Sequence, residues 1–170
     1  MRLAPQVQFS VSAVPAAWGS AGVAQTMREM RRLIDEGKRD AEVMRAAGAV
    51  IFTTPEKLEA GEVCAVFEYV RDHVRYVRDV VGHETLASAR MTLARQAGDC
   101  DDQTVLLGAM LESVGYPVRL VVAAYQAPNQ WEHVFLEVWA AGEWIACDPT
   151  EKAPLGWSPP NPCSLWTEAR

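Results

Sequence analysis

The sequence feature that most constrains the fold is the turn Gly98-Asp99-Cys100, because it places a thiol at the point where a helix begins. The residues that follow recur at the spacing of one buried helical face. They are Thr104, Leu107, Met110, Leu111 and Val114. Gly115 is a typical helix C-cap, and Pro117 prevents the helix from continuing. The sequence therefore predicts an amphipathic helix with Cys100 in its first turn.

The position of Cys100 favours a reactive thiol. Unpaired N–H groups and the positive end of the helix dipole stabilise an anion in the first turn of a helix. A thiolate is such an anion, and it is the reactive form of cysteine. The alternative is a buried structural thiol, because free cysteines also pack as small hydrophobic residues.

Three carboxylates flank this thiol, those of Asp99, Asp101 and Asp102. Their charges should raise the pKa of the thiol and oppose the helix dipole. Helix capping by Asp99, or salt bridges from the other two carboxylates to Arg90 or Arg95, would reduce this effect. The acidic run lacks the alternation and the glycine of an EF-hand loop, so we do not expect a calcium site.

Length and composition indicate one soluble domain. With 170 residues, of which 49% are hydrophobic and 22% charged, the chain can bury one substantial core. The net charge of -6 and the pI near 5.1 give no electrostatic footprint for nucleic acid or for an anionic membrane. We therefore expect neither nucleic acid nor a membrane as a partner, and the oligomeric state is left open.

The chain carries no segment typical of export or of membrane insertion. No apolar run approaches the ~20 residues of a membrane-spanning helix. Pro5 and Pro15 interrupt the N-terminus, which lacks the pattern of a secretion signal. The cysteines are scattered along the chain, at Cys64, Cys100, Cys147 and Cys163. We therefore expect reduced thiols and a cytoplasmic location.

The hydrophobic periodicity predicts an α+β fold, with helices first and an antiparallel sheet after them. Helices are expected over 20–37, after the cap Asp40, from Thr54-Pro55, over 63–77, after the cap Thr85 and from Cys100. Strands are expected over 6–14, 118–124, 133–139 and 144–148, with an extended segment over 75–84 that turns at Gly82. Prolines and glycines from Pro149 onward indicate a tail without regular structure. We expect a single domain over 1–150, with a helical N-terminal part (20–62) and a core (63–150), followed by a Pro-rich tail (151–170).

The last two predicted strands bring a histidine and an aspartate together. We expect them to form an antiparallel hairpin around Ala141-Gly142. In that register, the residues on one face are His133, Phe135, Asp148 and Thr150. His133 and Asp148 are then diagonal neighbours, close enough for the carboxylate to hold the imidazole. Cys147 projects from the opposite face and is expected in the core.

These residues supply a nucleophile, a base and an orienting group, as nucleophilic acyl transfer requires. His133 would take the thiol proton and return it to the departing amine, while Asp148 would fix the tautomer of the imidazole. The backbone N–H of Cys100 is the expected oxyanion donor, and Gln96 is a candidate for the second donor. A zinc site made of Cys100, His133 and Cys147 is not expected, because Cys147 faces away and no Cys-x-x-Cys spacing occurs.

This constellation resembles the transglutaminase-like proteins. Members of that family carry a Gly-Asp-Cys turn, a hydrophobic helix that ends near glycine, and then His and Asp on successive strands of a papain-like core. The matching residues are Gly98-Asp99-Cys100-Asp101-Asp102, Leu107, Leu111, Gly115, Arg119, Glu132-His133-Val134, Glu137-Val138, Trp144 and Asp148-Pro149-Thr150, with Tyr76, Val77 and Asp79 upstream. The resemblance covers residues 63–150 and is closest to the short bacterial and phage-encoded members. It implies a Cys100-His133-Asp148 catalytic triad that acts on amides through a thioester.

Three functions are open at this point. The first is a cysteine-dependent amide hydrolase or protease that acts on a protein or peptide substrate. The second is a transglutaminase, in which the same triad passes the acyl group to an amine instead of water, a choice that depends on the shape of the cleft. The third, from another class, is a non-catalytic structural or assembly protein that retains the fold. No cofactor and no metal are expected.

Overall fold

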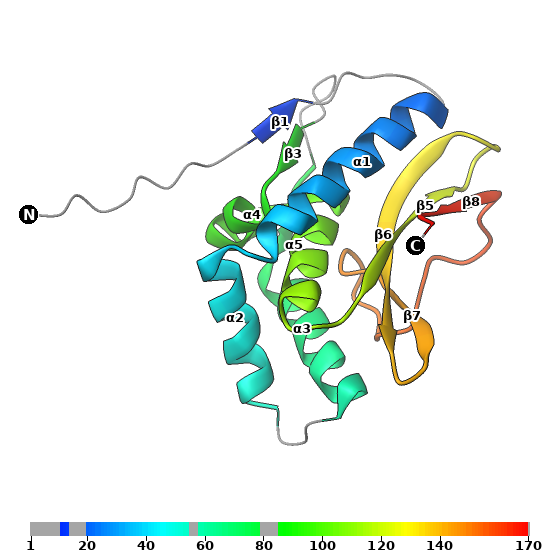
Figure 1. The fold of residues 1–170 in the computed structure, drawn as a ribbon. Helices are drawn as coiled ribbons and strands as arrows, with labels where there is room; N and C mark the ends of the chain where they lie inside the picture. Colours follow the sequence, from blue (N-terminus) through cyan, green and yellow to red (C-terminus); the bar gives the residue numbers. More distant parts are fainter. Residues whose placement is uncertain (1–10, 14–19, 55–57, 79–84, 170) are drawn as a thin grey trace, which may run out of the picture.

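The computed structural model describes residues 11–13, 20–54, 58–78 and 85–169. It has the expected α+β class, with a group of helices packed against one side of a four-stranded antiparallel sheet (Figure 1). The helices are α1 (Ser20–Gly37), α2 (Ala41–Phe52), α3 (Glu59–His73), α4 (Ala89–Arg95) and α5 (Cys100–Ser113). The strands are β1 (Val11–Ala13), β2 (Arg75–Tyr76), β3 (Thr85–Ala87), β4 (Ala97–Gly98), β5 (Val118–Ala124), β6 (Trp131–Ala140), β7 (Glu143–Cys147) and β8 (Ser164–Thr167).

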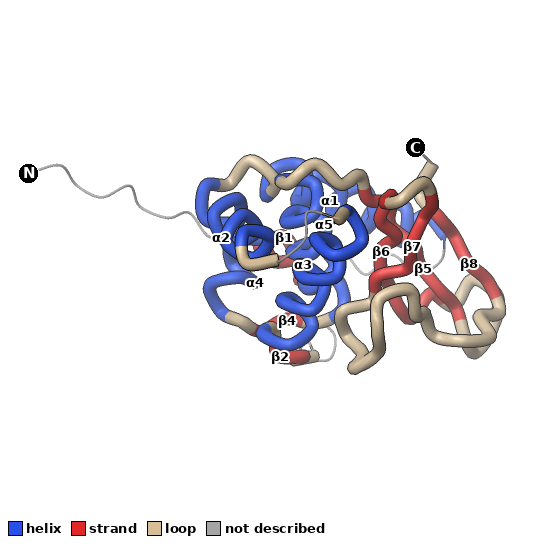
Figure 2. Tube along the Cα trace, turned by 90° about the horizontal axis from the view of Figure 1, so that it is seen from below, coloured by secondary structure: helices blue, strands red, loops and turns tan. Residues whose placement is uncertain are grey.

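The helix that begins at Cys100 is the centre of the molecule. Viewed from below, α5 lies among the other helices, and the sheet closes its remaining side (Figure 2). Every residue from Asp102 to Leu111 is buried. The prediction of a helix with one buried face is therefore wrong, because the neighbouring helices and β6 cover α5 on all sides. Gly108 permits the close approach of α1, since a Cβ there would lie 2.8 Å from the Ile34 side chain.

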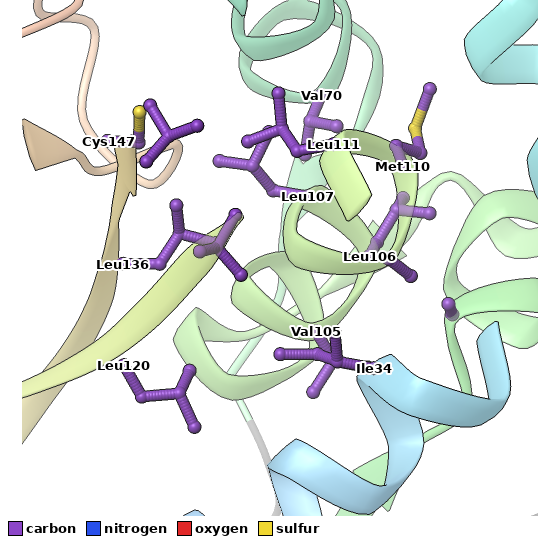
Figure 3. Close-up of a cluster of buried hydrophobic side chains, with 14 of the residues drawn as sticks. Ile34, Val70, Val105, Leu106, Leu107, Met110, Leu111, Leu120, Leu136 and Cys147 are labelled. Carbon is purple, nitrogen blue, oxygen red and sulfur yellow. The ribbon is translucent and has the colours of Figure 1, made fainter. Parts of the chain in front are cut away.

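The main hydrophobic core lies between α5 and the sheet. Leu107 and Leu111 of α5 meet Leu136 of β6 and Cys147 of β7 in one cluster of buried side chains (Figure 3). Each of these four side chains is 0% exposed. Cys147 therefore faces the core, as its place on the hairpin predicts.

The strand register is the one expected from the sequence. The sheet order is β7-β6-β5-β8, and β6 and β7 form an antiparallel hairpin. Its ladder runs from Ala140 opposite Glu143 to Leu136 opposite Cys147. The loop residues Ala141 and Gly142 have φ values of 53° and 87°, as a tight hairpin turn of the type I′ class requires.

Element boundaries before Cys100 differ in part from the prediction. The first helix spans the expected residues 20–37, and the second begins directly after its expected cap, Asp40. The third helix spans Glu59–His73, so it starts after Thr54-Pro55 and ends before Val77, because the chain leaves it to pair β2 with β4. Thr85 is not a helix cap, since it lies in β3 and pairs with β1. Ser88 caps α4 instead.

Some expectations fall outside the described residues. The N-terminal strand is described over Val11–Ala13, while residues 6–10 and 14 of the expected strand are not described. The expected turn at Gly82 and Pro55, the expected first residue of a helix capped by Thr54, also lie outside the described residues.

The Pro-rich segment contains a strand that the sequence did not indicate. Ser164–Thr167 forms β8 and pairs antiparallel with the edge of β5. Glu168 fixes its end, because its carboxylate accepts hydrogen bonds from Arg31 at 2.8 and 2.9 Å and from the Leu120 N–H at 3.1 Å. The expectation of no regular structure after Pro149 is therefore wrong for this strand.

Candidate active site

The turn before the thiol is hydrogen-bonded to the segment after β2 and to the first turn of α5. The Gly98 carbonyl accepts the Val77 N–H at 3.0 Å and the side-chain amide of Gln103 at 3.2 Å. A Cβ at position 98 would lie 2.5 Å from the Cβ of Asp102, which real Cβ atoms essentially never approach. A glycine is therefore required for this turn to lie against the first turn of α5.

Asp99 starts the helix as its N-cap. Its side chain accepts hydrogen bonds from the N–H groups of Asp101 at 3.1 Å and Asp102 at 3.2 Å. The predicted capping role is thus confirmed, and Cys100 is the first helical residue. The buried carboxylate of Asp102 accepts the Ala87 N–H at 2.8 Å, so it also anchors the end of β3.

Burial and the neighbouring carboxylates set the protonation of the Cys100 thiol. Burial is the largest cause that raises its pKa, followed by the negative charges of Asp101 and Asp99. The sulfur donates a hydrogen bond to Asp101 Oδ1 at 3.5 Å, while a hydrogen bond from the Val134 N–H opposes the increase in pKa. Burial and the carboxylates thus act against the helix dipole and favour the protonated thiol.

His133 and Asp148 meet as the predicted register requires. His133 Nε2 lies 2.6 Å from Asp148 Oδ2, which leaves Nδ1 as the ring nitrogen not engaged in this bond. Asp148 is 0% exposed. Its second oxygen accepts the backbone N–H of Thr150 at 3.1 Å and the Thr150 hydroxyl at 2.6 Å. A buried, fully bonded carboxylate therefore holds the imidazole in one orientation.

The start of α5 meets β6 at the residue next to His133. Val134 donates its N–H to the Cys100 sulfur and accepts the Thr104 hydroxyl at 3.3 Å. This contact is possible because the ladder between β6 and β7 ends at Leu136, which leaves this stretch of β6 accessible from the β7 side. The sulfur thus accepts a hydrogen bond from the backbone of the residue that follows His133. In the described residues, its side-chain hydrogen bond goes to Asp101, not to the imidazole.

Gln96, the candidate for the second oxyanion donor, lies at the end of α4. It is the C-cap of that helix and has a left-handed backbone conformation with φ of 50°. Its carbonyl accepts the Arg75 N–H at 2.9 Å, and its side chain is exposed. A contribution of this side chain to the reaction stays a prediction.

Three polar side chains near the site have no catalytic role predicted from the sequence: Gln103, Tyr125 and Tyr76, the last of which belongs to the residues that match the family. Gln103 and Tyr125 each carry a buried oxygen without a hydrogen-bond partner among the described residues. Burial and then the charge of Asp148 raise the pKa of Tyr125. Strand alternation beyond β5 could have indicated Tyr125, and a polar residue one turn after the thiol could have indicated Gln103. Tyr76 reaches the site through a pairing distant in sequence, which has no local signal.

The described residues contain neither a candidate metal site nor a helix that could span a membrane. Among them, no three histidine, cysteine, aspartate or glutamate side chains gather in a way that could hold a metal ion. No described helix combines the length and the hydropathy that crossing a bilayer requires. All four cysteines are free.

Several solved structures share the fold of this chain. A candidate cysteine protease from Cytophaga hutchinsonii is 17% identical with a TM-score of 0.57, and the match covers 93% of this chain and 54% of that one. LapG from Legionella pneumophila is 20% identical with a TM-score of 0.51, and the match covers 74% of this chain and 75% of that one. The chain thus spans about half the length of the Cytophaga protein. At these identities the similarity shows the fold.

The sequence itself matches a family model. No curated protein shows significant sequence similarity to the chain. The model of the transglutaminase-like superfamily matches residues 46–149, which include the turn of the thiol, His133 and Asp148. The match starts earlier than the expected core, within α2, so it takes in part of the helical layer. The chain belongs to the transglutaminase-like superfamily.

Proposed function

We propose that this protein is a cysteine-dependent amide hydrolase that acts on protein or peptide substrates through a Cys100-His133-Asp148 triad. The observation that carries the proposal is the 2.6 Å hydrogen bond between His133 and the buried Asp148. The next residue along the strand, Val134, donates its N–H to the Cys100 sulfur, so the residue that carries the imidazole lies beside this contact. A surface histidine without a role would not need a fully buried carboxylate to hold its ring.

The proposed reaction uses the two ring nitrogens of His133 for different tasks. Asp148 binds Nε2, so Nδ1 is available to take the proton of the thiol. The sulfur then adds to the carbonyl carbon of the substrate, and the backbone N–H of Cys100 donates to the oxyanion. The imidazolium returns its proton to the amine nitrogen as the C–N bond breaks, which leaves a thioester. Water activated by Nδ1 hydrolyses the thioester and restores the thiol.

The raised pKa of Cys100 determines the first step of this reaction. A preformed thiolate–imidazolium pair requires a thiol pKa below that of the imidazole. Burial and Asp101 act in the opposite direction here. Proton transfer to His133 therefore accompanies the attack on the substrate, as it does when a hydroxyl is activated by an adjacent base.

Alkylation with iodoacetamide at neutral pH, followed by peptide mass spectrometry, tests the triad. We expect His133→Ala to slow the alkylation of Cys100 by at least about tenfold, because the base is lost. Cys163 is exposed and serves as a control within the same molecule, since its rate should not change. Equal rates at Cys100 in the variant and the parent protein would contradict the proposal.

A second assay separates hydrolysis from acyl transfer. The protein is incubated with a glutamine-containing peptide and a fluorescent primary amine. Release of ammonia or of a peptide fragment without amine incorporation supports the hydrolase. Incorporation of the amine that depends on Cys100 would instead support transglutaminase chemistry with the same three residues. If neither hydrolysis nor amine incorporation is detected and Cys100 is also unreactive, the result would support the non-catalytic function.

A further inference from the structure

The two oxygens of the Asp148 carboxylate are bonded by different residues. Oδ2 lies 2.6 Å from His133 Nε2. Oδ1 accepts the hydroxyl of Thr150 at 2.6 Å and the backbone N–H of the same residue at 3.1 Å. One oxygen is therefore engaged by the imidazole, while Thr150 supplies both donors to the other.

The position of Asp148 in the fold makes these partners necessary. Asp148 lies one residue beyond the end of β7, where the ladder to β6 has already ended at the pair Leu136 and Cys147. The terminal torsion of an aspartate side chain has broad, roughly two-fold preferences, so the chain itself does not set the plane of the carboxylate. Hydrogen bonds to the carboxylate have to set it.

Thr150 is the first residue after Asp148 that can supply such bonds. Pro149 has no N–H, so the nearest backbone donor downstream is that of Thr150, two residues on, as in an Asx turn. Asp148 is 0% exposed, so bulk water does not reach its oxygens. The hydroxyl of Thr150 adds a second, shorter bond, which prevents the carboxylate from rotating about the single N–H contact.

A second hydroxyl near Asp148 does not share this role. Burial raises the pKa of the Tyr125 phenol most, and the negative charge of Asp148 raises it further. The Tyr125 hydroxyl is nevertheless buried without a hydrogen-bond partner among the described residues. Of these two hydroxyl groups, only that of Thr150 is hydrogen-bonded to the carboxylate.

We propose that Thr150 is a positioning residue of this site, whose hydroxyl directs Asp148 so that Oδ2 receives the hydrogen of His133 Nε2. This inference deepens the proposed function and depends on it. A carboxylate held in this way selects the tautomer with its hydrogen on Nε2, which leaves a lone pair on Nδ1. Nδ1 is the atom that takes the thiol proton in the proposed reaction.

Thr150 contributes to the reaction only through Asp148 and His133. When the thiol proton moves to Nδ1, the ring becomes an imidazolium, and Asp148 accepts the Nε2 hydrogen bond throughout. Thr150 neither gives nor takes a proton, and it does not touch the substrate. Without its hydroxyl, the carboxylate gains a second orientation, and a fraction of the imidazole carries its hydrogen on Nδ1, where it cannot act as a base.

Nitrogen NMR of the histidine rings tests the positioning directly. The chain has three histidines, so ¹⁵N-histidine labelling gives few signals, and those lost in His133→Ala belong to His133. The shift of a ring nitrogen depends on whether it carries a hydrogen. At mildly alkaline pH we expect a hydrogen on Nε2 and none on Nδ1 in the parent protein. Thr150→Val, which keeps the shape but lacks the hydroxyl, should show a mixture of both tautomers.

The rate of acylation measures the effect on the reaction. p-Nitrophenyl acetate acylates the Cys100 sulfur and releases p-nitrophenolate, a step that requires removal of the thiol proton. We expect Thr150→Val to slow this step by about tenfold, on the scale of losing one hydrogen bond to a charged group. Thr150→Ser keeps the hydroxyl and should restore the tautomer, with a rate within about twofold of the parent.

Matched variants separate positioning from stability. Thr26→Val removes a hydroxyl that binds the Gly22 carbonyl in α1, and Tyr125→Phe removes the other hydroxyl near Asp148. Neither should change the tautomer or the rate. Thr150→Ala also lacks the hydroxyl and should match Thr150→Val. The parental tautomer in both of these variants, or a Thr150→Ser variant as impaired as Thr150→Val, would overturn the inference.

Failure of the proposed function gives a different result. If Cys100→Ala releases p-nitrophenolate at the parental rate, Cys100 is not the nucleophile and the proposed function fails. The NMR result does not depend on turnover, so it still reports whether Thr150 sets the tautomer of His133.

Discussion

At the scale of single residues, burial and two neighbouring carboxylates raise the pKa of the Cys100 thiol. Asp99 is needed as the N-cap, and its charge raises the pKa of Cys100 as a side effect. Asp101 has the larger influence and also accepts the thiol hydrogen. The acidic run around Cys100 predicts this opposition of charges to the helix dipole. The resulting direction of the pKa shift depends mainly on the burial of the sulfur, which is set by the packing around it and not by the local sequence.

The first prediction concerns Asp101→Asn. Removing the negative charge lowers the pKa of Cys100, because the thiolate no longer faces a neighbouring carboxylate. A lower pKa means more thiolate at any pH below it. We therefore expect iodoacetamide to alkylate Cys100 several-fold faster at neutral pH, and the pH–rate profile to shift toward lower pH.

Asp72→Asn is the control for this charge change. Asp72 is an exposed carboxylate on α3 that pairs with Arg71, and it is not among the leading charges that act on the Cys100 thiol. It should leave the profile unchanged. Slower alkylation of Cys100 in Asp101→Asn would show that Asp101 assists the thiol instead of restraining it.

At the scale of elements, α5 is positioned by polar contacts at its start and by apolar contacts along its length. Its first turn is bonded to β3 through Asp102, to β4 through Gln103 and to β6 through Thr104. Such buried polar bonds are directional, so they fix the orientation of the helix more closely than leucine packing does. The apolar core then supplies most of the stability.

The second prediction tests the close contact at the start of α5. Gly98→Ala places a Cβ 2.5 Å from the Cβ of Asp102, so the turn or the helix must move. We expect the alkylation rate of Cys100 to fall and the free energy of unfolding to decrease by about 1–3 kcal/mol. Urea unfolding and the alkylation rate measure the two effects.

Gly48→Ala is the matched control in α2. A Cβ there has no heavy atom within 4 Å. Alanine favours the helix over glycine, so this variant should be more stable by about 0.5–1 kcal/mol with unchanged alkylation. A Gly98→Ala variant that behaves like Gly48→Ala would show that the turn does not need glycine.

At the scale of the whole molecule, the last strand links the sheet to the helical layer. Glu168 lies beyond β8, and Arg31 of α1 binds it together with Glu112 of α5. The carbonyl of Val118 also accepts from Arg31. One guanidinium thus connects α1, the end of α5, the start of β5 and the segment after β8.

The third prediction is that Glu168→Ala weakens this connection. It removes two acceptors of the partly buried Arg31 and the acceptor of the Leu120 N–H. We expect the free energy of unfolding to fall by about 1–3 kcal/mol, as measured by urea unfolding. Glu36→Ala breaks an exposed pair with Arg32 and should cost less than about 1 kcal/mol. Similar losses in both variants would argue against a special role for Glu168.

Local patterns were sufficient for much of this fold and for part of the site. The Asp99 cap, the strand β5 and the register that joins His133 to Asp148 follow from spacing, because each depends on neighbours in sequence. The burial of α5 on every side does not follow, since its polar first turn resembles an exposed one. The parallel pairing of Tyr76 with Gly98 and the strand β8 join distant segments, so no local pattern indicates them.

The hydrogen bond from the Cys100 sulfur to Asp101 has a further consequence, for the lifetime of the protein. Peroxides oxidise thiolates much faster than thiols, and the first product is a sulfenic acid. A sulfur that keeps its hydrogen resists this damage. The hydrogen bond to Asp101, which keeps Cys100 protonated and so slows its attack on a substrate, should therefore also protect the sulfur from oxidation.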